Sequence, residues 1–151
     1  MEPFSIKSSV FKEGGMIPQK YTSDGEGINP FLEFKNIPHE ARSLALIMDD
    51  PDGTRGLFTH WLLWNIDPST RYIMDDTVPQ GAVQGTNSAN TQRYFAPAPP
   101  HGAPAHRYQF TVFVLDVVLN LSPDTKRETL EEAFRGHILA QATLTGMYGR
   151  A

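Results

Sequence analysis

The chain of 151 residues contains no cysteine, which excludes disulfides, cysteine-ligated zinc and a cysteine nucleophile. It contains no apolar run near the ~18 residues of a membrane-spanning helix, so no integral membrane association is expected. Basic residues are not in excess, because 13 Lys and Arg against 17 Asp and Glu give a net charge of −4. That balance argues against a nucleic-acid partner, which requires a basic face.

Targeting signals and common catalytic motifs are also missing. Residues 1–7 lack a basic segment followed by an apolar one, so no secretory signal is expected and the cytoplasm is the default location. There is no Gly-x-Ser-x-Gly elbow, phosphate-binding loop or Gly-x-Gly-x-x-Gly turn. The five histidines show no His-x-x-x-His or His-x-His spacing. The sequence therefore predicts neither a cofactor nor a local metal site, and no catalytic residue.

The length predicts a single domain over residues 1–151 with a substantial core. Twelve prolines are spread along the chain and rule out a long helix before Pro123. Short apolar stretches between turn signals predict strands at residues 43–48, 59–66, 108–116 and 143–148, with weaker candidates at 8–11 and 31–34. This pattern favours an antiparallel sandwich or barrel.

Near the C-terminus the pattern changes to that of a helix, expected from about residue 125 to about residue 140. Residues 122–124 offer a capping residue and a proline for its start. Gly136 is a candidate break. The helix would carry one apolar stripe, formed by Leu130, Phe134 and Ile138. Packing of this stripe on the domain's own sheet is favoured over packing on a partner.

Two polar motifs follow or begin predicted strands. Asp49-Asp50-Pro51-Asp52 comes directly after the strand at 43–48, where carboxylates project into any crevice between the loops. A simple turn is the alternative, since Asp and Pro are frequent turn residues. Thr59-His60-Trp61 opens the next strand, and His60 is either a satisfied core residue or a ligand-facing base or donor.

Two further motifs lie after residue 93. Residues 94–102 are rich in proline and are either a rigid spacer or a preformed pocket wall, with backbone N–H groups near His101 and Gly102 directed at an anion. Their Pro99-Pro100 bond, with Asp50-Pro51, is a candidate cis peptide. His106-Arg107-Tyr108 enters the strongest predicted strand, where His106 and Tyr108 share a face. Two such hydrogen-bond donors on one face suit a phosphate or a carboxylate ligand. Alternatively, the two side chains are simply half exposed to solvent at the edge of the sheet and bind nothing.

In this order and spacing the motifs resemble the phosphatidylethanolamine-binding protein (Raf kinase inhibitor-like) family, and its short prokaryotic branch most closely. The similarity extends from residues 9–11 to residues 144–150. It implies a mainly β fold, a two-sheet antiparallel β-sandwich with a few short helices, one of them near the C-terminus. It also implies non-catalytic binding of phosphate-bearing or other small anionic ligands, and in several members inhibition of a kinase or protease partner. The implied ligand-binding residues are Asp50, Asp52, His60, Tyr94, Pro99, Pro100, Gly102, His106 and Tyr108.

The chain departs from the family pattern at Ala96 and Ala98, where Gly and Cys are usual, and at Phe34, where Trp is common. The first change restricts the backbone, and the second removes a thiol from the pocket rim. Oligomeric state is open between monomer and homodimer.

One alternative function is a metal-dependent hydrolase that uses Asp50, Asp52, His60 and His106. The anion-binding interpretation itself meets a difficulty, because two carboxylates in a protein of net charge −4 should repel phosphate. Attraction must then come from local donors on the histidines, the tyrosines and the loop backbone.

Overall fold

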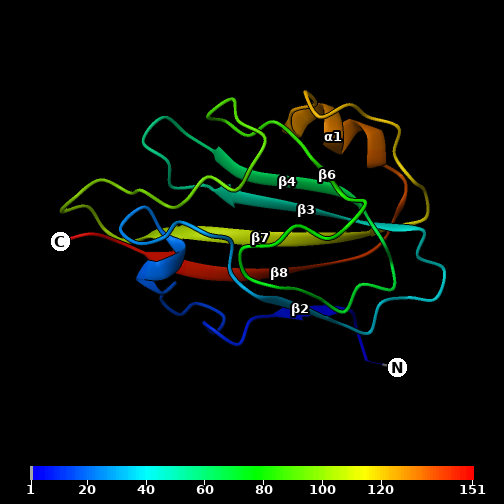
Figure 1. The fold of residues 1–151 in the computed structure, drawn as a ribbon, viewed down its shortest axis with the longest axis horizontal. Coiled ribbons are helices and arrows are strands. Elements are labelled where there is room, and N and C mark those ends of the chain that lie inside the picture. The colour runs from blue at the N-terminus through cyan, green and yellow to red at the C-terminus, as the bar shows by residue number, and fades with distance from the viewer. Residues whose placement is uncertain (1) are drawn as a thin grey trace.

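Short apolar segments separated by prolines fold into two antiparallel sheets (Figure 1). The computed structural model describes residues 2–151. One sheet has the strand order β1-β2-β5 and the other the order β6-β4-β3-β7-β8. The elements are β1 (Ser5–Lys7), a 3₁₀ helix (Gln19–Tyr21), β2 (Leu32–Lys35), β3 (Ser43–Asp50), β4 (Phe58–Ile66), β5 (Tyr72–Ile73), β6 (Val83–Gln84), β7 (His106–Leu115), α1 (Arg127–Phe134) and β8 (Ile138–Tyr148).

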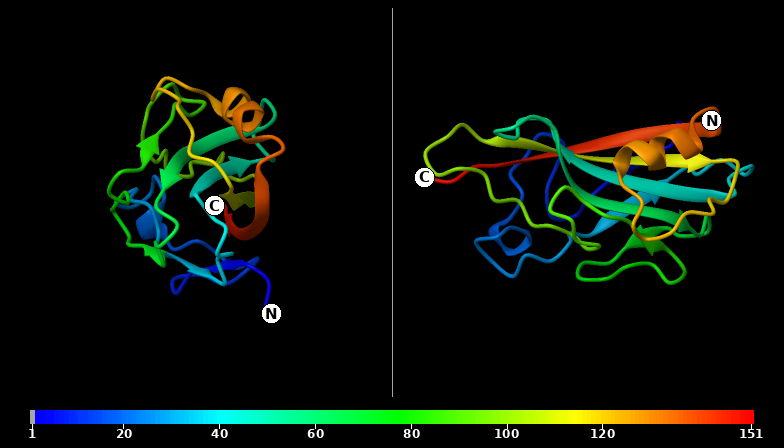
Figure 2. Two further views of the ribbon diagram at one scale, coloured as in Figure 1. Left: turned by 90° about the vertical axis from the view of Figure 1, so that its right-hand side faces the viewer. Right: turned by 90° about the horizontal axis from the view of Figure 1, so that it is seen from above.

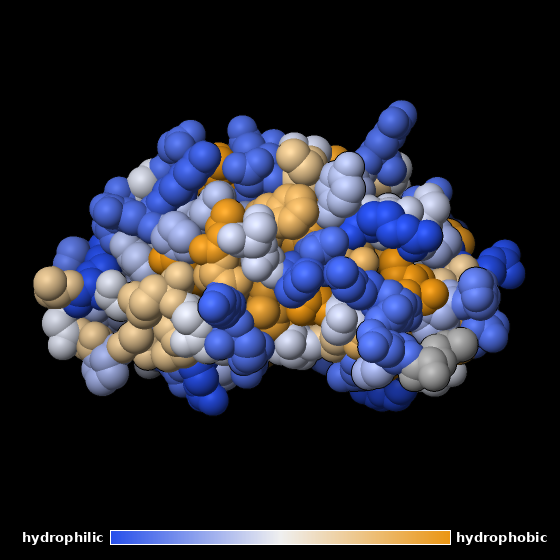
Figure 3. Space-filling view, turned by 90° about the horizontal axis from the view of Figure 1, so that it is seen from below, coloured by the Kyte–Doolittle hydropathy of each residue, from blue (hydrophilic) through white to orange (hydrophobic). Residues whose placement is uncertain are grey.

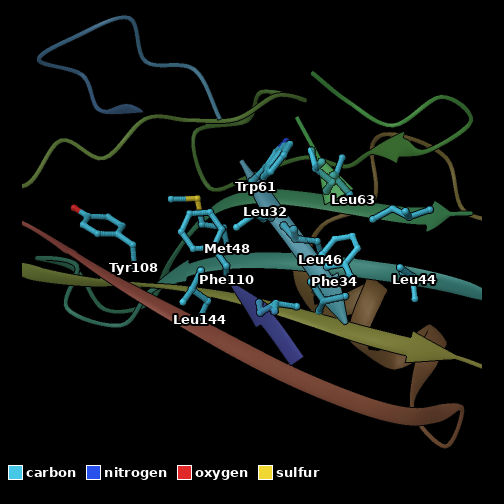
Figure 4. Packing of buried hydrophobic residues seen from close by; sticks show 14 of the residues in the cluster. Leu32, Phe34, Leu44, Leu46, Met48, Trp61, Leu63, Tyr108, Phe110 and Leu144 are labelled. Carbon is cyan, nitrogen blue, oxygen red and sulfur yellow. The ribbon is translucent and has the colours of Figure 1, made fainter. Parts of the chain in front are cut away.

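Strand β3 is buried along its whole length because it lies inside the larger sheet and both of its faces are covered. Leu44, Leu46 and Met48 alternate onto the face that packs against the smaller sheet, in the core drawn in Figure 4. Ala45 and Ile47 point to the opposite face, which carries α1. Figure 2 shows α1 on the side of the larger sheet that faces away from the smaller one.

The prediction of a two-sheet antiparallel fold is confirmed. The strands predicted at 43–48, 59–66 and 108–116 are present, with shifts of one or two residues at their ends. The strand predicted at 8–11 is wrong, because β1 ends at Lys7 and the chain beyond it is irregular.

The predicted helix at 125–140 is too long. Helix α1 ends at Phe134, and Gly136 adopts φ 83°, a left-handed conformation that glycine tolerates and that turns the chain into β8. Ile138 therefore lies in a strand and is 40% exposed. Leu130 and Phe134 are buried against the larger sheet, so the helix packs on its own domain as predicted.

Several other expectations concern the backbone and the surface. All peptide bonds within residues 2–151 are trans, including the two candidate cis bonds before Pro51 and Pro100. No helix in that range is long and apolar enough to cross a membrane. Some apolar side chains stay exposed, among them Tyr72 and Met74, and Figure 3 shows one face on which hydrophobic patches interrupt a hydrophilic surface.

Candidate functional site

Three antiparallel strands of the larger sheet bring polar residues to one end. Asp50 is the last residue of β3, while Phe58 and His106 are the first residues of β4 and β7. Since β4 and β7 both run antiparallel to β3, the end of β3 and the beginnings of β4 and β7 meet at the same end of the sheet. They enclose a pocket of about 210 Å³ with the proline-rich segment as its wall. We call it the strand-end pocket, and it is lined by Asp50, Gly53, Thr54, Phe58, His60, Phe95, Ala98, Pro99, Pro100, His106 and Tyr108.

Asp50 and His106 form a buried hydrogen-bonded pair inside the pocket. The His106 Nδ1 atom lies 2.7 Å from Asp50 Oδ2, and the two side chains are only 10% and 5% exposed. The other carboxylate oxygen accepts the backbone N–H of Asp52 at 2.8 Å. Because a carboxylate only accepts, the hydrogen-bond network assigns the proton to His106 Nδ1. The Nε2 atom of the neutral ring is then an acceptor.

His60 is held in the same tautomer by a different acceptor. Its Nδ1 lies 2.6 Å from the backbone oxygen of Phe95, and the Phe95 N–H donates in turn to the His60 carbonyl at 3.0 Å. Burial lowers the pKa of His60 below its ordinary value, and the hydrogen bond to Phe95 and the charge of Asp50 only partly oppose this. The neutral ring is therefore favoured, with Nε2 again as an acceptor.

Five aromatic rings form the apolar part of the pocket. The His60 ring lies 4.8 Å from Phe58, 5.8 Å from Phe95 and 5.3 Å from Tyr108, measured between ring centroids. His106 stacks on Tyr108 at 6.3 Å. These contacts fix the orientation of both imidazoles and leave ring surface facing the cavity.

The polar atoms left free for a ligand are few. Within residues 2–151 no hydrogen bond engages Nε2 of His60 or His106, and neither atom is sealed from solvent. The Tyr108 phenol is the main side-chain donor, because burial and the nearby Asp50 raise its pKa and keep it protonated. A neutral pocket thus offers two acceptors and one donor, and protonation of the imidazoles turns those acceptors into donors.

The structure brings together six of the nine residues predicted for the site, namely Asp50, His60, Pro99, Pro100, His106 and Tyr108. Asp52 does not line the pocket. Its carboxylate instead accepts from the Arg107 backbone N–H, Nε and Nη2 at 2.8–3.0 Å. Asp52 therefore fastens the β3–β4 loop to β7 on the outside of the pocket.

Tyr94 and Gly102 also lie away from the pocket. The Tyr94 hydroxyl donates to the backbone oxygen of Tyr21 at 2.8 Å, and its ring lines a neighbouring cavity of about 510 Å³. The Gly102 N–H donates to the Arg150 carbonyl at 3.0 Å, so it is not directed at a ligand as the sequence suggested. Alternation along the strand, in contrast, does place His106 and Tyr108 on one face and Arg107 on the other.

Sequence reasoning did not assign Phe58, Gly53 and Thr54 to the pocket. They lie at the connection between the Asp-Pro-Asp and His-Trp motifs. If the two predicted strands on either side had been paired as a hairpin, these residues would have been placed beside Asp50. Only glycine is accommodated at position 53 without a shift of the loop, because a Cβ there would lie 2.4 Å from the Gly56 carbonyl oxygen.

The alternative metal site finds no support in the geometry. In the described part of the chain no group of three or more His, Asp or Glu side chains is arranged to hold a metal ion. Asp52 is paired with Arg107, and Asp50 already receives two hydrogen bonds.

Comparisons with known proteins agree with the observed fold. A profile of the phosphatidylethanolamine-binding protein family matches residues 7–149. A UPF0098 protein of Methanothermobacter thermautotrophicus is 42% identical, covering 97% of this chain and 99% of that protein. A crystal structure from Chlamydia trachomatis, described as a putative phosphatidylethanolamine-binding protein homolog, has a TM-score of 0.95 at 38% identity and full coverage of both chains. Escherichia coli YbcL, described as a new member of the mammalian PEBP family, shares the fold with a TM-score of 0.92 at 24% identity over 99% and 100% of the two chains. The chain therefore belongs to the phosphatidylethanolamine-binding protein family.

Proposed function

We propose that the chain is a non-catalytic binding protein for phosphate-bearing or other small anionic ligands, which it holds in the strand-end pocket. The observation that supports this most directly is the meeting of the two imidazoles and the Tyr108 phenol in one small open cavity. Residues 46 positions apart in the sequence, His60 and His106, line the same cavity, and no hydrogen bond within residues 2–151 engages the Nε2 atom of either ring.

Anion binding at this pocket depends on imidazole protonation. Each protonated ring gains an N–H at Nε2, and charge-assisted hydrogen bonds contribute about 1.5–3 kcal/mol each. Two or three of them, less the entropy of association, give roughly millimolar to micromolar affinity for a bare oxyanion. Because burial lowers the pKa of His60, the affinity continues to rise as the pH falls below about 6.5.

Calorimetric titration with phosphorylethanolamine at pH 5.5 tests the proposal. His60→Ala should weaken binding at least tenfold, the loss of one charge-assisted hydrogen bond. His137→Ala is the control, because it removes another hydrogen-bonded imidazole, one that pairs with Asp116 at 2.9 Å but is exposed and outside the pocket. Equal heats for the wild type and His60→Ala would remove the proposal.

The second part of the proposal is that an occupied pocket modulates a kinase or protease partner by inhibition. The rim of the pocket is the proline-rich segment, whose restricted backbone loses little entropy when a partner contacts it. Pull-down with purified candidate enzymes, with and without phosphorylethanolamine, tests this part. A partner that ignores both the ligand and a Pro99→Ala change would contradict it. Homodimer formation and a cytoplasmic location stay predictions, which sedimentation and cell fractionation would check.

A further inference from the structure

A second cavity, of about 510 Å³, lies beside the strand-end pocket and shares Phe95 and Ala98 with it. We call it the Arg93 cavity, and it is lined by residues 23, 27–29, 76–78, 84, 93–96 and 98. Its volume lies in the range of small-molecule sites in proteins. The proposed function makes no use of the charged and amide side chains in this cavity.

Two amide side chains in the Arg93 cavity are oriented by the protein's own hydrogen bonds. Asn29 is only 6% exposed, and its Nδ2 donates to the backbone oxygens of Met74 and Thr77, both at 3.2 Å. Its Oδ1 accepts no hydrogen bond within residues 2–151 and is not sealed from solvent. Gln84 is turned the other way, since its Oε1 accepts the indole N–H of Trp61 at 2.9 Å, which leaves the Nε2 protons free. Asn29 thus presents an acceptor to the cavity, and Gln84 presents donors.

One charged group of each sign accompanies the two amides. Asp76 is close to Asn29, whose backbone oxygen accepts the Asp76 N–H at 3.1 Å. Arg93 enters the hydrogen-bond network through its backbone oxygen, which accepts from Asn87 Nδ2 at 2.8 Å. Within residues 2–151 the Asp76 carboxylate and the Arg93 guanidinium pair neither with each other nor with another side chain. The cavity therefore contains an acidic acceptor group, Asn29 with Asp76, and a basic donor group, Gln84 with Arg93.

The rest of the wall is largely apolar. Ile28 and Val78 line the cavity and also pack against the main core. The hydroxyl of Tyr94 is engaged by the backbone oxygen of Tyr21, so Tyr94 contributes mainly ring surface, as does Phe95. A simple anion would meet the Asp76 carboxylate here, and a simple cation would meet the Arg93 guanidinium. The ligand that matches all three parts of the wall carries a carboxylate, an ammonium group and a hydrocarbon group.

We propose that the Arg93 cavity binds a free α-amino acid with an apolar side chain. The carboxylate of the amino acid accepts hydrogen bonds from the Arg93 guanidinium and Gln84 Nε2. Its ammonium group donates to Asn29 Oδ1 and to the Asp76 carboxylate, and its hydrocarbon side chain packs on the apolar wall. This second site uses none of the histidines and does not depend on anion binding in the strand-end pocket.

The test titrates three probes into the full chain at pH 7 and follows the indole N–H signals by NMR. The probes are L-leucine, isocaproate, which is leucine without its ammonium group, and isoamylamine, which is leucine without its carboxylate. The Trp61 indole reports on the cavity, because it donates to Gln84 and packs edge-on against Tyr94 with ring centroids 5.5 Å apart. The Trp64 indole is an internal reference, since it lies in the separate core under α1.

We expect L-leucine to move the Trp61 signal but not the Trp64 signal, with a roughly millimolar dissociation constant. It should bind about threefold to tenfold more tightly than isocaproate or isoamylamine, since each of these lacks one charged contact. Arg93→Gln should weaken leucine and isocaproate by a similar factor and leave isoamylamine unchanged. Asp76→Asn should weaken leucine and isoamylamine and leave isocaproate unchanged. Asparagine suits position 76 because the backbone there has φ 53°, a left-handed conformation that asparagine tolerates.

Arg42→Gln and Asp75→Asn are the matched controls, because each removes the same charge from a residue that does not line the cavity. A Trp61 signal that stays in place up to the solubility limit of leucine would overturn the proposal. So would a leucine affinity no higher than that of both shortened probes, or one that the control variants lower as much as the cavity variants do. The phosphorylethanolamine titration with His60→Ala tests the strand-end pocket separately, so either proposal can fail while the other stands.

Discussion

Asp52 provides the sharpest test of whether the Asp-Pro-Asp motif serves the ligand or the fold. Its carboxylate accepts three hydrogen bonds from Arg107, at 2.9 Å from the backbone N, 3.0 Å from Nε and 2.8 Å from Nη2. These bonds, the side-chain ones first, lower the pKa of Asp52 from 3.8 to about 2. That shift corresponds to at most ~2.4 kcal/mol at 1.36 kcal/mol per pH unit. Solvent reaches both partners, with 51% and 30% of their side chains exposed, so screening reduces the contribution to roughly 1 kcal/mol.

Urea denaturation of Asp52→Asn at pH 7, 4 and 3 measures this contribution. A folded-state pKa below the unfolded one stabilises the fold at pH values above about 3.8, and this stabilisation is lost as the pH falls toward 2. We therefore expect a deficit of roughly 1 kcal/mol at pH 7 that shrinks by pH 3. Glu132→Gln is the control, since its ion pair with Arg135 is longer, at 3.8 Å, and highly exposed. We expect the affinity of Asp52→Asn for phosphorylethanolamine at pH 5.5 to stay within about twofold of the wild-type affinity, a smaller change than the loss of one hydrogen bond to the ligand would cause. Unchanged stability at pH 7, or a loss of affinity as large as that of His60→Ala, would refute the reasoning.

Three further predictions concern the fold around the pocket. Leu130→Ala should lower the free energy of unfolding by about 2–5 kcal/mol, because Leu130 is fully buried between α1 and the larger sheet. Ile138→Ala, at a 40% exposed position, should lower it by well under half as much in the same urea titration. Gly146→Ala should destabilise by about 1–3 kcal/mol in thermal or urea unfolding, since its Cβ would lie 2.5 Å from Ile17 Cγ1; a neutral effect would show that this side chain moves freely. Because burial lowers the pKa of His60, the unfolded chain takes up its proton first, so stability falls as the pH drops below about 6.5; His60→Leu should show a shallower pH dependence between pH 7 and 5.

Apolar periodicity predicted the central strands well because they are buried on both sides. Residues 44–48 form a continuous apolar run, and strand β3 extends it only to Ser43 at one end and Asp50 at the other. The short strands of the smaller sheet carry two to four residues each, and such runs are too short for a periodic signal. The helix boundary was misplaced because Ile138 matches the helical spacing, whereas Gly136 breaks the backbone before it.

The lining of the strand-end pocket was predicted in part, and the failures at Asp52 and Tyr94 share one cause. Asp52 and Tyr94 carry the same chemical groups as true pocket residues, and the order of motifs cannot tell a side chain that faces the pocket from one that faces away. Asp52 lies two residues after Asp50, yet its carboxylate turns toward Arg107 outside the pocket. Tyr94 is committed to the Tyr21 carbonyl, a contact between segments 73 residues apart.

The sequence by itself determined the family, the mainly β architecture and the pairing of His106 with Tyr108 on one strand face, because these depend on local patterns and on the order of motifs. Only the tertiary structure decided which nitrogen of each imidazole remains free. That choice depends on the Phe95 carbonyl and the Asp50 carboxylate, which lie 35 and 56 residues away along the chain. The hydrogen-bonding character of the pocket follows from those two long-range contacts.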